Sequence, residues 1–581
     1  MEKRWVLKQQ GEMPLVQQFA TQLNIDPPLA NLLLQRGIRS FDEAKAFFRP
    51  SLNDLHDPFL MKDMDKAIGR IESAIQNQEK ILIYGDYDVD GTSAVALVYT
   101  FLHKFYDKLD FYIPDRYFEG YGISNRGIDF AAENGFSLII ALDCGIKSVD
   151  KIIYARSKDV DFIICDHHRP GSELPPANAV LDPKRPDCIY PYKELSGCGI
   201  GFKLIQAYAQ KNNLAFEELI QYLDLVVVSI ASDIVEITGE NRVLASYGLK
   251  LLNTHPRPGL EAILKYSNVI KKEEENGASF FNKELTITDL VFLIGPRINA
   301  AGRIESGRNS VKLLICQDKE EALRLGVQIN NYNTERKNLD ALATQQAIEM
   351  ISQDEGLKSA RSTVIYNPEW HKGIIGIVAS RLTEHYYRPT IVLTLSGDLI
   401  TGSARSVKDF DIYEAIDACS DLLEHFGGHK YAAGLSLKPE NLIEFTKKFE
   451  NVVCERMKGI EFVPEIEIDT ILPLHAIHSR FYNILKQFAP FGPGNMAPVF
   501  QTEGVINAGG TRVVGKNHLK LYIVHPEVSG GPFSGIAFQQ GAHVEKIEEG
   551  SPFTICYHIE ENEWNGMVSL QLNVKDIKFE S

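Results

Sequence analysis

Four short, uninterrupted runs of apolar residues constrain the fold of this chain more than any other feature. They occupy residues 81–84, 111–113, 138–142 and 162–165, and amphipathic helical patterns separate them. A strand covered on both faces is apolar throughout, whereas a strand with one exposed face alternates between apolar and polar residues. Because strands that alternate with helices form mostly parallel sheets, we predict a doubly wound, mostly parallel α/β sheet.

A long helix is predicted in the middle of the chain. Apolar residues recur there at helical spacing from about Asp318 to Gln353, with strongly polar positions between them. At 1.5 Å per residue such a helix is about 50 Å long, which suits a connector between two domains. Gly356 is its predicted stop.

The 581 residues are too many for one hydrophobic core, so several domains are expected. The final segment shows alternation of period two, as in "SLQLNVKDIKF", which is typical of a small β-barrel. We predict five regions: an N-terminal helical segment (1–65), the doubly wound domain (66–275), a connector with the long helix (276–355), a second α/β domain (356–455) and a C-terminal OB-like β-barrel (456–581).

Composition limits the possible functions. No apolar run reaches the roughly 18 residues that span a bilayer, and the start of the sequence has no apolar segment typical of an export signal. The eight cysteines include no C-x-x-C pair, which favours a reducing, cytoplasmic location. Because the formal net charge is −16, a nucleic-acid-binding role requires positive groups or metal ions to be concentrated locally.

Carboxylates and imidazoles follow the predicted strands. Three aspartates in "DYDVDG" follow the first run, Asp143 follows the third, and an aspartate and two histidines in "CDHH" follow the fourth. Asp233 ends another apolar run, "DLVVVSIASD". Because the carboxyl edge of an open α/β sheet is where ligands bind, we expect these groups to converge there.

Each of these groups has an ordinary structural interpretation when taken alone. A D-x-D pair or Asp143 could cap a helix, and paired histidines are commonly structural. Their coincidence at the ends of separate strands favours a metal centre, since crowded carboxylates repel one another unless cations are bound. Aspartate with histidine suits Mn²⁺ or Mg²⁺, and there are enough ligands for two ions about 3.5–4 Å apart.

These motifs resemble a known family. "DYDVDG", "LDCG", "CDHH" and "ASDIV", in that order, resemble the four motifs of the DHH phosphoesterase superfamily. More closely, the chain is similar to the RecJ family of single-strand-specific 5′→3′ DNA exonucleases. The similarity extends over residues 66–510, through "PDRYFEGYGIS", "GCGIGFKL", "GPRINAAGR", "WHKGIIGIVASRL", "TGSARS", "GGHKYAAGLSL" and "PFGPGNMAPVF". The second α/β domain would then be DHHA1-like.

The resemblance implies roles for the candidate metal ligands. Asp143 would bridge the two ions, Asp88 would hold one, and the other would be held by Asp90, His167 and Asp233. His168 would contact the scissile phosphate or assist the leaving group, and Asp86 would be a ligand or would orient one. Tyr84 stands where many members of the superfamily have a histidine ligand, so one ion is expected to bind more weakly.

Glycine- and arginine-rich motifs supply candidate phosphate-binding groups, because glycine permits close approach of a backbone N–H and arginine forms a bidentate fork. Taken singly, such residues are usually turns or solvated side chains. Tyr117, Phe118 and Trp370 could stack on bases or could be ordinary core and rim residues. The predicted substrate-binding set is Arg116, Tyr121, Arg297, Arg303, Arg308, His371, Ser403, Arg405, Ser406, Gly428, His429 and Lys430.

The resemblance implies an exonuclease that degrades single-stranded DNA to 5′-mononucleotides by a two-metal mechanism in DNA repair and recombination. It also implies contacts with single-stranded-DNA-binding protein and a helicase of the RecQ type; we further expect a monomer with no membrane association. Two alternatives stay open. One is a superfamily enzyme that acts on oligoribonucleotides, cyclic dinucleotides or pyrophosphate. The other is a non-catalytic scaffold in a replication complex.

Overall fold

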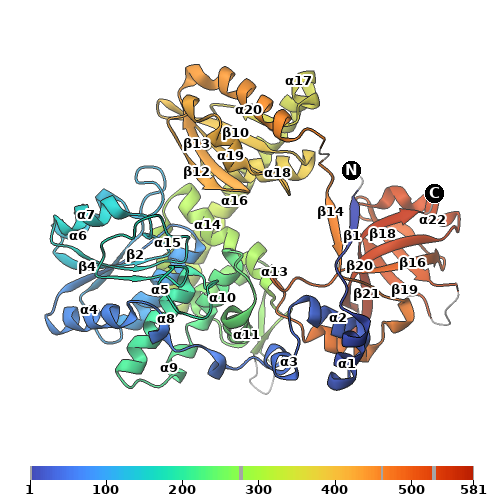
Figure 1. Cartoon of the computed structure of the whole chain (residues 1–581), viewed down its shortest axis with the longest axis horizontal. Coiled ribbons are helices and arrows are strands. Elements are labelled where there is room, and N and C mark those ends of the chain that lie inside the picture. The colour runs from blue at the N-terminus through green and yellow to red at the C-terminus, as the bar shows by residue number, and fades with distance from the viewer. Residues whose placement is uncertain (1–2, 274–278, 460–461, 527–530, 565, 580–581) are drawn as a thin grey trace.

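The computed structural model describes residues 3–273, 279–459, 462–526, 531–564 and 566–579. Two α/β domains and a β-barrel succeed one another along the chain, and the long helix α16 (Lys319–Gln353) leads from the first α/β domain to the second (Figure 1). Among the described helices, none combines the length and apolar character required to cross a bilayer.

The first domain contains a five-stranded sheet in the order β3-β2-β4-β5-β6, with every neighbouring pair parallel. Its strands are β2 (Lys80–Gly85), β3 (Leu109–Tyr112), β4 (Phe136–Leu142), β5 (Asp161–Cys165) and β6 (Ala179–Leu181). The predicted doubly wound sheet is thus confirmed, and the four apolar runs lie on β2, β3, β4 and β5, with Ile113 one residue beyond the end of β3. Strand β6 has only three residues, which is too short to give a pattern in the sequence.

Helices cover both faces of this sheet. Helices α6 (Asn125–Glu133) and α7 (Val149–Arg156) pack on one face, through Ile128 and Ile152. The other face is covered by α4 (Met64–Gln76), α5 (Val89–Leu102) and α8 (Gly197–Lys211). This double coverage explains why the strands are apolar at successive positions.

The apolar run that ends at Asp233 is a helix, α10 (Leu223–Ser232), whose first nine residues are all buried. A helix buried on all sides and a buried strand give similar apolar runs, so sequence alone does not distinguish them. Further helices complete this domain and lead to the connector: α11 (Gly239–Thr254), α12 (Pro258–Lys265), α14 (Gly295–Ile304) and α15 (Gly307–Ile315).

The predicted long helix is present, but its predicted stop is wrong. The helix begins after Asp318, whose side chain accepts a hydrogen bond from the Glu321 N–H, and it ends at Gln353. Asp354 then caps a new short helix, α17 (Glu355–Ser359), by accepting a hydrogen bond from the Leu357 N–H. Gly356 therefore lies inside α17, because Asp354 caps a new helix that begins one residue before the glycine.

The second α/β domain has a mixed sheet in the order β12-β13-β11-β10-β9. Its strands are β9 (Thr363–Tyr366), β10 (Thr390–Ser396), β11 (Leu399–Arg405), β12 (His425–His429) and β13 (Ala432–Leu437), and its main helices are α18 (Ile375–Tyr386), α19 (Ile412–Asp417) and α20 (Leu442–Arg456). Asp340 of α16 forms ion pairs with Arg336 of its own helix (2.7 Å) and with Arg381 of α18 (2.6 Å). The connector is thus joined to the second domain by a buried carboxylate.

The C-terminal sheet closes into a barrel, because β16 (Phe500–Asn507) pairs with both β20 (Phe553–Trp564) and β18 (His518–Val524). The remaining strands of the ring are β19 (Phe533–Ala537) and β21 (Met567–Phe579). This confirms the predicted OB-like barrel.

The N-terminal segment packs on the C-terminal barrel. Helices α1 (Met13–Leu23), α2 (Pro27–Gln35) and α3 (Phe41–Phe48) contribute to the same hydrophobic core as the barrel strands (Figure 1). The segment also contains a strand, β1 (Arg4–Leu7), which pairs in parallel with β14 (Glu465–Ile468) between the second domain and the barrel. The two ends of the chain therefore meet.

Candidate metal centre and phosphate-binding groups

The candidate metal ligands lie together at the carboxyl edge of the first sheet. Asp86 follows β2, Asp143 follows β4, and His167 and His168 come just after β5. Asp233 terminates α10, which brings a ligand from a helix to the same edge. The structure therefore brings together groups that are far apart in the sequence.

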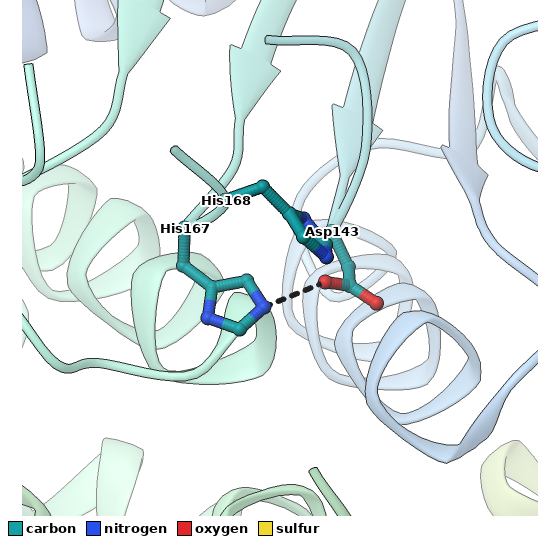
Figure 2. Close-up of side chains that lie close together, drawn as sticks. All are labelled: Asp143, His167 and His168. Carbon is teal, nitrogen blue, oxygen red and sulfur yellow. Dashed lines mark ion pairs between the residues drawn. The ribbon is translucent and has the colours of Figure 1, made fainter. Parts of the chain in front are cut away.

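His167 is the centre of this cluster. Its Nε2 atom lies 3.2 Å from Oδ1 of Asp143 (Figure 2). The same atom lies 3.4 Å from Oδ2 of Asp233 and 3.8 Å from Oδ2 of Asp90. Two sets of side chains have ligand atoms close enough to share one ion: Asp143 with His167 and His168, and Asp90 with His167 and Asp233. Because both sets contain His167, the two candidate sites are adjacent.

The backbone of Asp143 has a left-handed conformation, with φ of 60°. Aspartate tolerates this region better than most residues, and here it turns the chain directly after β4. The Asp143 N–H still donates to the Cys165 carbonyl oxygen at 2.8 Å, so the residue remains attached to the neighbouring strand β5. Gly197 packs against it, and a Cβ atom there would lie 2.6 Å from the Asp143 Cβ.

Asp90 is oriented by the N-terminus of α8. Its carboxylate accepts hydrogen bonds from the backbone N–H groups of Gly197 and Cys198, each at 2.7 Å. The Ser229 hydroxyl of α10 donates a third, also at 2.7 Å. These three hydrogen bonds from the end of one helix and the side of another orient the Asp90 side chain in the cluster.

Burial and mutual repulsion raise the pKa values of the carboxyl groups. Burial and the charge of Asp88 raise the pKa of Asp86, and burial and the charge of Asp90 raise those of Asp88 and Asp143. The same causes raise the pKa of Asp233 to about 8. Such a set of acids is stabilised as carboxylates when cations bind among them.

Several buried ligand atoms have no hydrogen-bond partner. Within the described residues these include both carboxylate oxygens of Asp86, Oδ1 of Asp143 and both ring nitrogens of His167. A buried polar atom without a partner is costly, and a bound ion would supply the missing interaction. The donor set of oxygen and imidazole nitrogen fits Mn²⁺ or Mg²⁺.

Asp166 is not among the predicted ligands, and its carboxylate oxygens contact other protein groups. Its Oδ1 lies 2.7 Å from Nδ1 of His168, and its Oδ2 accepts from the Ile146 N–H at 2.9 Å. Although burial opposes both changes, this contact lowers the pKa of Asp166 to about 2 and raises the pKa of His168 to about 9. Asp166 therefore orients a cationic His168, whose Nε2 lies 3.4 Å from the Tyr121 hydroxyl.

Tyr84 has no free hydroxyl to offer an ion. Its hydroxyl donates to the Gly122 carbonyl oxygen at 2.9 Å and accepts from the Ser124 N–H at 3.1 Å. Its ring stacks on Tyr112 at a centroid distance of 5.4 Å. At the position where many superfamily members have a histidine, this chain has a residue that fixes the loop at 122–124.

Three arginines from both α/β domains form a second cluster, Arg116, Arg303 and Arg405. Burial and the charge of Arg116 lower the pKa of both Arg405 and Arg303, the latter to about 10. Within the described residues none of the three forms an ion pair with a carboxylate. Half-buried guanidinium groups without a carboxylate partner suit an anion site.

Aromatic contacts connect this arginine cluster to the metal centre. Arg116 lies over the Tyr87 ring at 4.9 Å, and Tyr87 contacts Tyr121, which in turn contacts His168. Ser403 accepts a hydrogen bond from Arg405 at 3.1 Å, and Arg303 donates to the Gly373 carbonyl oxygen at 2.8 Å, beside His371.

Other members of the predicted substrate-binding set have structural partners. Arg297 donates to the carbonyl oxygens of Leu293 and Tyr266, and Arg308 lies 3.5 Å from Asp110 and over the Phe111 ring. The structure does not bring these two arginines into the arginine cluster. Trp370 is buried and donates to Gln346, Ser406 donates to the Phe410 carbonyl oxygen, and Phe118 and Lys430 are exposed.

Strand β12 of the second domain faces the metal centre of the first. Burial and the positive charges of Lys147, His168 and Arg169 lower the pKa of His429, which places His429 close to them. Gly428, with φ of 148°, precedes it. Lys147 and Arg169 are absent from the predicted set, although they stand four residues after Asp143 and one after His168.

Comparison with known proteins gives concordant results. Residues 80–230 match the DHH family N-terminal domain, residues 360–455 the DHHA1 domain and residues 468–576 the RecJ OB domain. The chain is 36% identical to the single-stranded-DNA-specific exonuclease RecJ of Bacillus subtilis, with 99% of this chain and 70% of that protein covered. It is 31% identical to the protein of the same name from Escherichia coli, with 95% and 96% covered.

Two solved structures are similar over long stretches. RecJ from Thermus thermophilus in complex with Mn²⁺ has a TM-score of 0.83 and 25% identity, with 100% of this chain and 80% of that chain covered. A second structure, an exonuclease RecJ bound to manganese, has a TM-score of 0.58 and 28% identity, with 70% and 96% covered.

Proposed function

We propose that this chain hydrolyses single-stranded DNA from the 5′ end and releases 5′-mononucleotides, because it belongs to the RecJ family of single-stranded-DNA-specific exonucleases. The observation that carries this proposal is the pair of adjacent ligand sets that share His167. Mn²⁺ or Mg²⁺ would be held by Asp90, Asp143, His167 and Asp233, with Asp86 and Asp88 beside them. Two such ions, when bound, supply Lewis-acid stabilisation and lower the pKa of a water molecule.

The residues of the chain orient and protonate the substrate. In the reaction, the oxygen of water forms a bond to phosphorus, the bond from phosphorus to O3′ of the terminal nucleotide breaks, and O3′ takes a proton. His168 is placed to give that proton from Nε2, because Nδ1 is engaged by Asp166 at 2.7 Å. His168 also faces Tyr121, which leads to the arginine cluster.

The arginine cluster supports 5′ polarity. Because Arg303 and Arg405 are half-buried, we assign this cluster to the phosphate of a chain end rather than to an internal phosphate. A 5′-terminal phosphate in this cluster would place the next phosphodiester at the metal centre. Selectivity for single strands would follow, because Arg116 and Arg405 belong to different α/β domains and a strand bound by both would run between them.

Replacing Arg405 with alanine should raise KM for a 5′-phosphorylated strand about 10- to 30-fold, the value of one charged hydrogen bond. The increase should be much smaller for a strand with a 5′-hydroxyl, which lacks the bound anion. Steady-state kinetics on the two strands measure the difference. Arg156→Ala, at the exposed end of α7, is the matched control and should change neither KM. Equal increases in KM for the two strands would show that the arginine cluster does not bind the terminal phosphate.

The proposed function is tested with one strand labelled at either end. A 5′ label should be released as a mononucleotide at the earliest times, whereas a 3′ label should remain on progressively shorter strands. A chelator should stop the reaction, and added Mn²⁺ or Mg²⁺ should restore it. Early release of the 3′ label, or equal rates on single and double strands, contradicts the proposal.

Two other functions are weighed against it. A superfamily enzyme for short oligoribonucleotides, cyclic dinucleotides or pyrophosphate does not need the barrel, which this chain has at residues 468–576. A non-catalytic scaffold does not need the ligands, which are present here. Comparing rates on a dinucleotide and on a long strand distinguishes the first alternative, and absence of any nuclease activity in Mn²⁺ would favour the second.

The expected biological setting is DNA repair and recombination. We propose a cytoplasmic location, in keeping with eight free cysteines, and a monomeric enzyme. Single-stranded-DNA-binding protein and a helicase of the RecQ type are the proposed partners. Pull-down with each purified partner, together with light scattering of the enzyme alone, tests these proposals.

A further inference from the structure

We propose that Lys147 and Arg169 form a second cationic subsite, which binds the phosphodiester on the 3′ side of the scissile phosphate and so makes the enzyme favour strands longer than a dinucleotide. This inference rests on the proposed function, since it assigns a place to a part of the same substrate.

Both residues are tied by sequence to the metal centre. Lys147 is in the loop that follows β4 and Asp143, and Arg169 directly follows His168. The two loops are in contact, because a Cβ atom on Gly171 would lie 3.9 Å from Cγ of Lys147. The loops that carry the two positive side chains therefore lie side by side, next to residues that would hold the ions.

A cavity of about 490 Å³ opens beside them. It is lined by Arg169, Pro170, Gly171, Lys184, Pro186 and Glu194. Lys184 is neutralised by Glu194 at 3.2 Å, whereas Lys147 and Arg169 form no ion pair within the described residues. On a chain with a net charge of −16, two unpaired cations beside a polar cavity concentrate positive potential at one place.

The second domain approaches Lys147 and Arg169 through His429. His429 of β12 is close enough to Lys147 and Arg169 for their charges to lower its pKa, after the larger effect of burial. No carboxylate is among the groups that shift it. A strand that leaves the metal centre in this direction would pass Lys147 and Arg169 on the first domain and the imidazole of His429 on the second.

The two cationic groups differ in enclosure, which determines what each can bind. Arg303 and Arg405 are half-buried, whereas Lys147 and Arg169 are exposed to solvent. An enclosed site suits the end of a chain, and an open site allows the strand to continue. The terminal phosphate would thus lie in the arginine cluster, the scissile phosphate at the metal centre and the next phosphodiester beside Lys147 and Arg169.

The double variant Lys147→Ala/Arg169→Ala should lose affinity for long strands only. The probes are 5′-phosphorylated oligothymidylates of two and eight nucleotides, and binding is measured in an Asp143→Ala background so that no cleavage occurs. Loss of two phosphate contacts should reduce the slope of log affinity against log salt by about 1.4 for the octanucleotide. The dinucleotide, which has no phosphodiester beyond the scissile one, should be unaffected.

Hydrolysis by the enzyme with Asp143 intact should follow the same pattern. We expect kcat/KM to fall about 10-fold for the octanucleotide and less than 2-fold for the dinucleotide. Lys211→Ala/Lys250→Ala, at exposed positions of α8 and α11, removes the same charge elsewhere and should leave the salt slope unchanged. Lys147→Gln/Arg169→Gln, which keeps side-chain length, separates charge from packing and should behave like the alanine variant.

Equal losses on both lengths, or an unchanged salt slope, would overturn the inference. Because the salt slope is an equilibrium measurement, it is read whether or not the enzyme is active. Failure of the wild-type enzyme to degrade the long strand would instead contradict the proposed function. The two failures are therefore distinguishable.

Discussion

Replacing Asp143 with alanine should reduce the rate of single-strand hydrolysis by roughly four orders of magnitude, because the several kcal/mol that bound ions contribute would be lost. Asp143 belongs to one candidate ion-binding set and approaches His167, which belongs to both. Its left-handed backbone and the hydrogen bond from its N–H to the Cys165 carbonyl oxygen hold it at this position. DNA binding should persist, since the arginine cluster and Lys147 with Arg169 are untouched.

This prediction is checked by three measurements on the Asp143→Ala variant. Single-turnover kinetics give the rate, calorimetric titration with Mn²⁺ gives the affinity and number of ions, and fluorescence anisotropy gives DNA binding. The matched control is Asp150→Ala, an exposed aspartate in the first turn of α7, which should resemble the wild type in all three. A variant that binds Mn²⁺ and cleaves DNA within about tenfold of the wild type would place the centre elsewhere.

The convergence of the ligands could be predicted from sequence because it depends on local patterns. Asp86, Asp143 and His167 follow strands whose apolar runs are unambiguous, and parallel strands share a carboxyl edge. The position of Asp233 could be predicted although its element is a helix, since only the end of the run mattered. The same apolar runs therefore predict both the fold of the sheet and the residues that lie at its carboxyl edge.

The roles of Asp166 and Tyr84 could not be predicted, because their partners are set by the folded backbone. Asp166 is in the same motif as two histidines, yet its oxygens are occupied by the His168 ring and by the Ile146 N–H. Tyr84 is hydrogen-bonded to residues 38 and 40 positions away. Neither set of contacts produces a periodic pattern of residues in the sequence.

The association of the two chain ends is a long-range feature of the same kind. Strand β1 has four residues, and its partner β14 lies more than 450 residues along the chain. The helices α1 to α3 show ordinary amphipathic patterns, which do not say that the surface they cover belongs to the barrel. Sequence patterns identify such elements but not their partners when the pairing is this distant.

Replacing Gly197 with alanine should inactivate the enzyme although glycine has no chemistry of its own. The added Cβ would lie 2.6 Å from Cβ and 2.7 Å from Oδ1 of Asp143, closer than such atoms approach one another. Asp143 cannot easily move away, because its backbone N–H is bonded to Cys165 and its φ is 60°. The Gly197 N–H that holds Asp90 at 2.7 Å would shift as well. We expect Mn²⁺ affinity to fall about 10- to 100-fold, as when groups that orient metal ligands are lost.

The neighbouring glycine of the same helix provides the control. A Cβ on Gly199 would meet the Ser196 hydroxyl at 3.3 Å and Leu195 at 3.5 Å, and neither residue is a candidate ligand. Alanine is normally more stable than glycine in a helix by about 1 kcal/mol, so Gly199→Ala should leave stability equal or slightly higher. Gly197→Ala should instead lower it by about 1–3 kcal/mol through overpacking. Thermal unfolding and Mn²⁺ titration of the two variants measure both effects. Because the substitutions are chemically identical and two residues apart, retention of Mn²⁺ affinity in Gly197→Ala would mean that Asp143 is not held where its backbone places it.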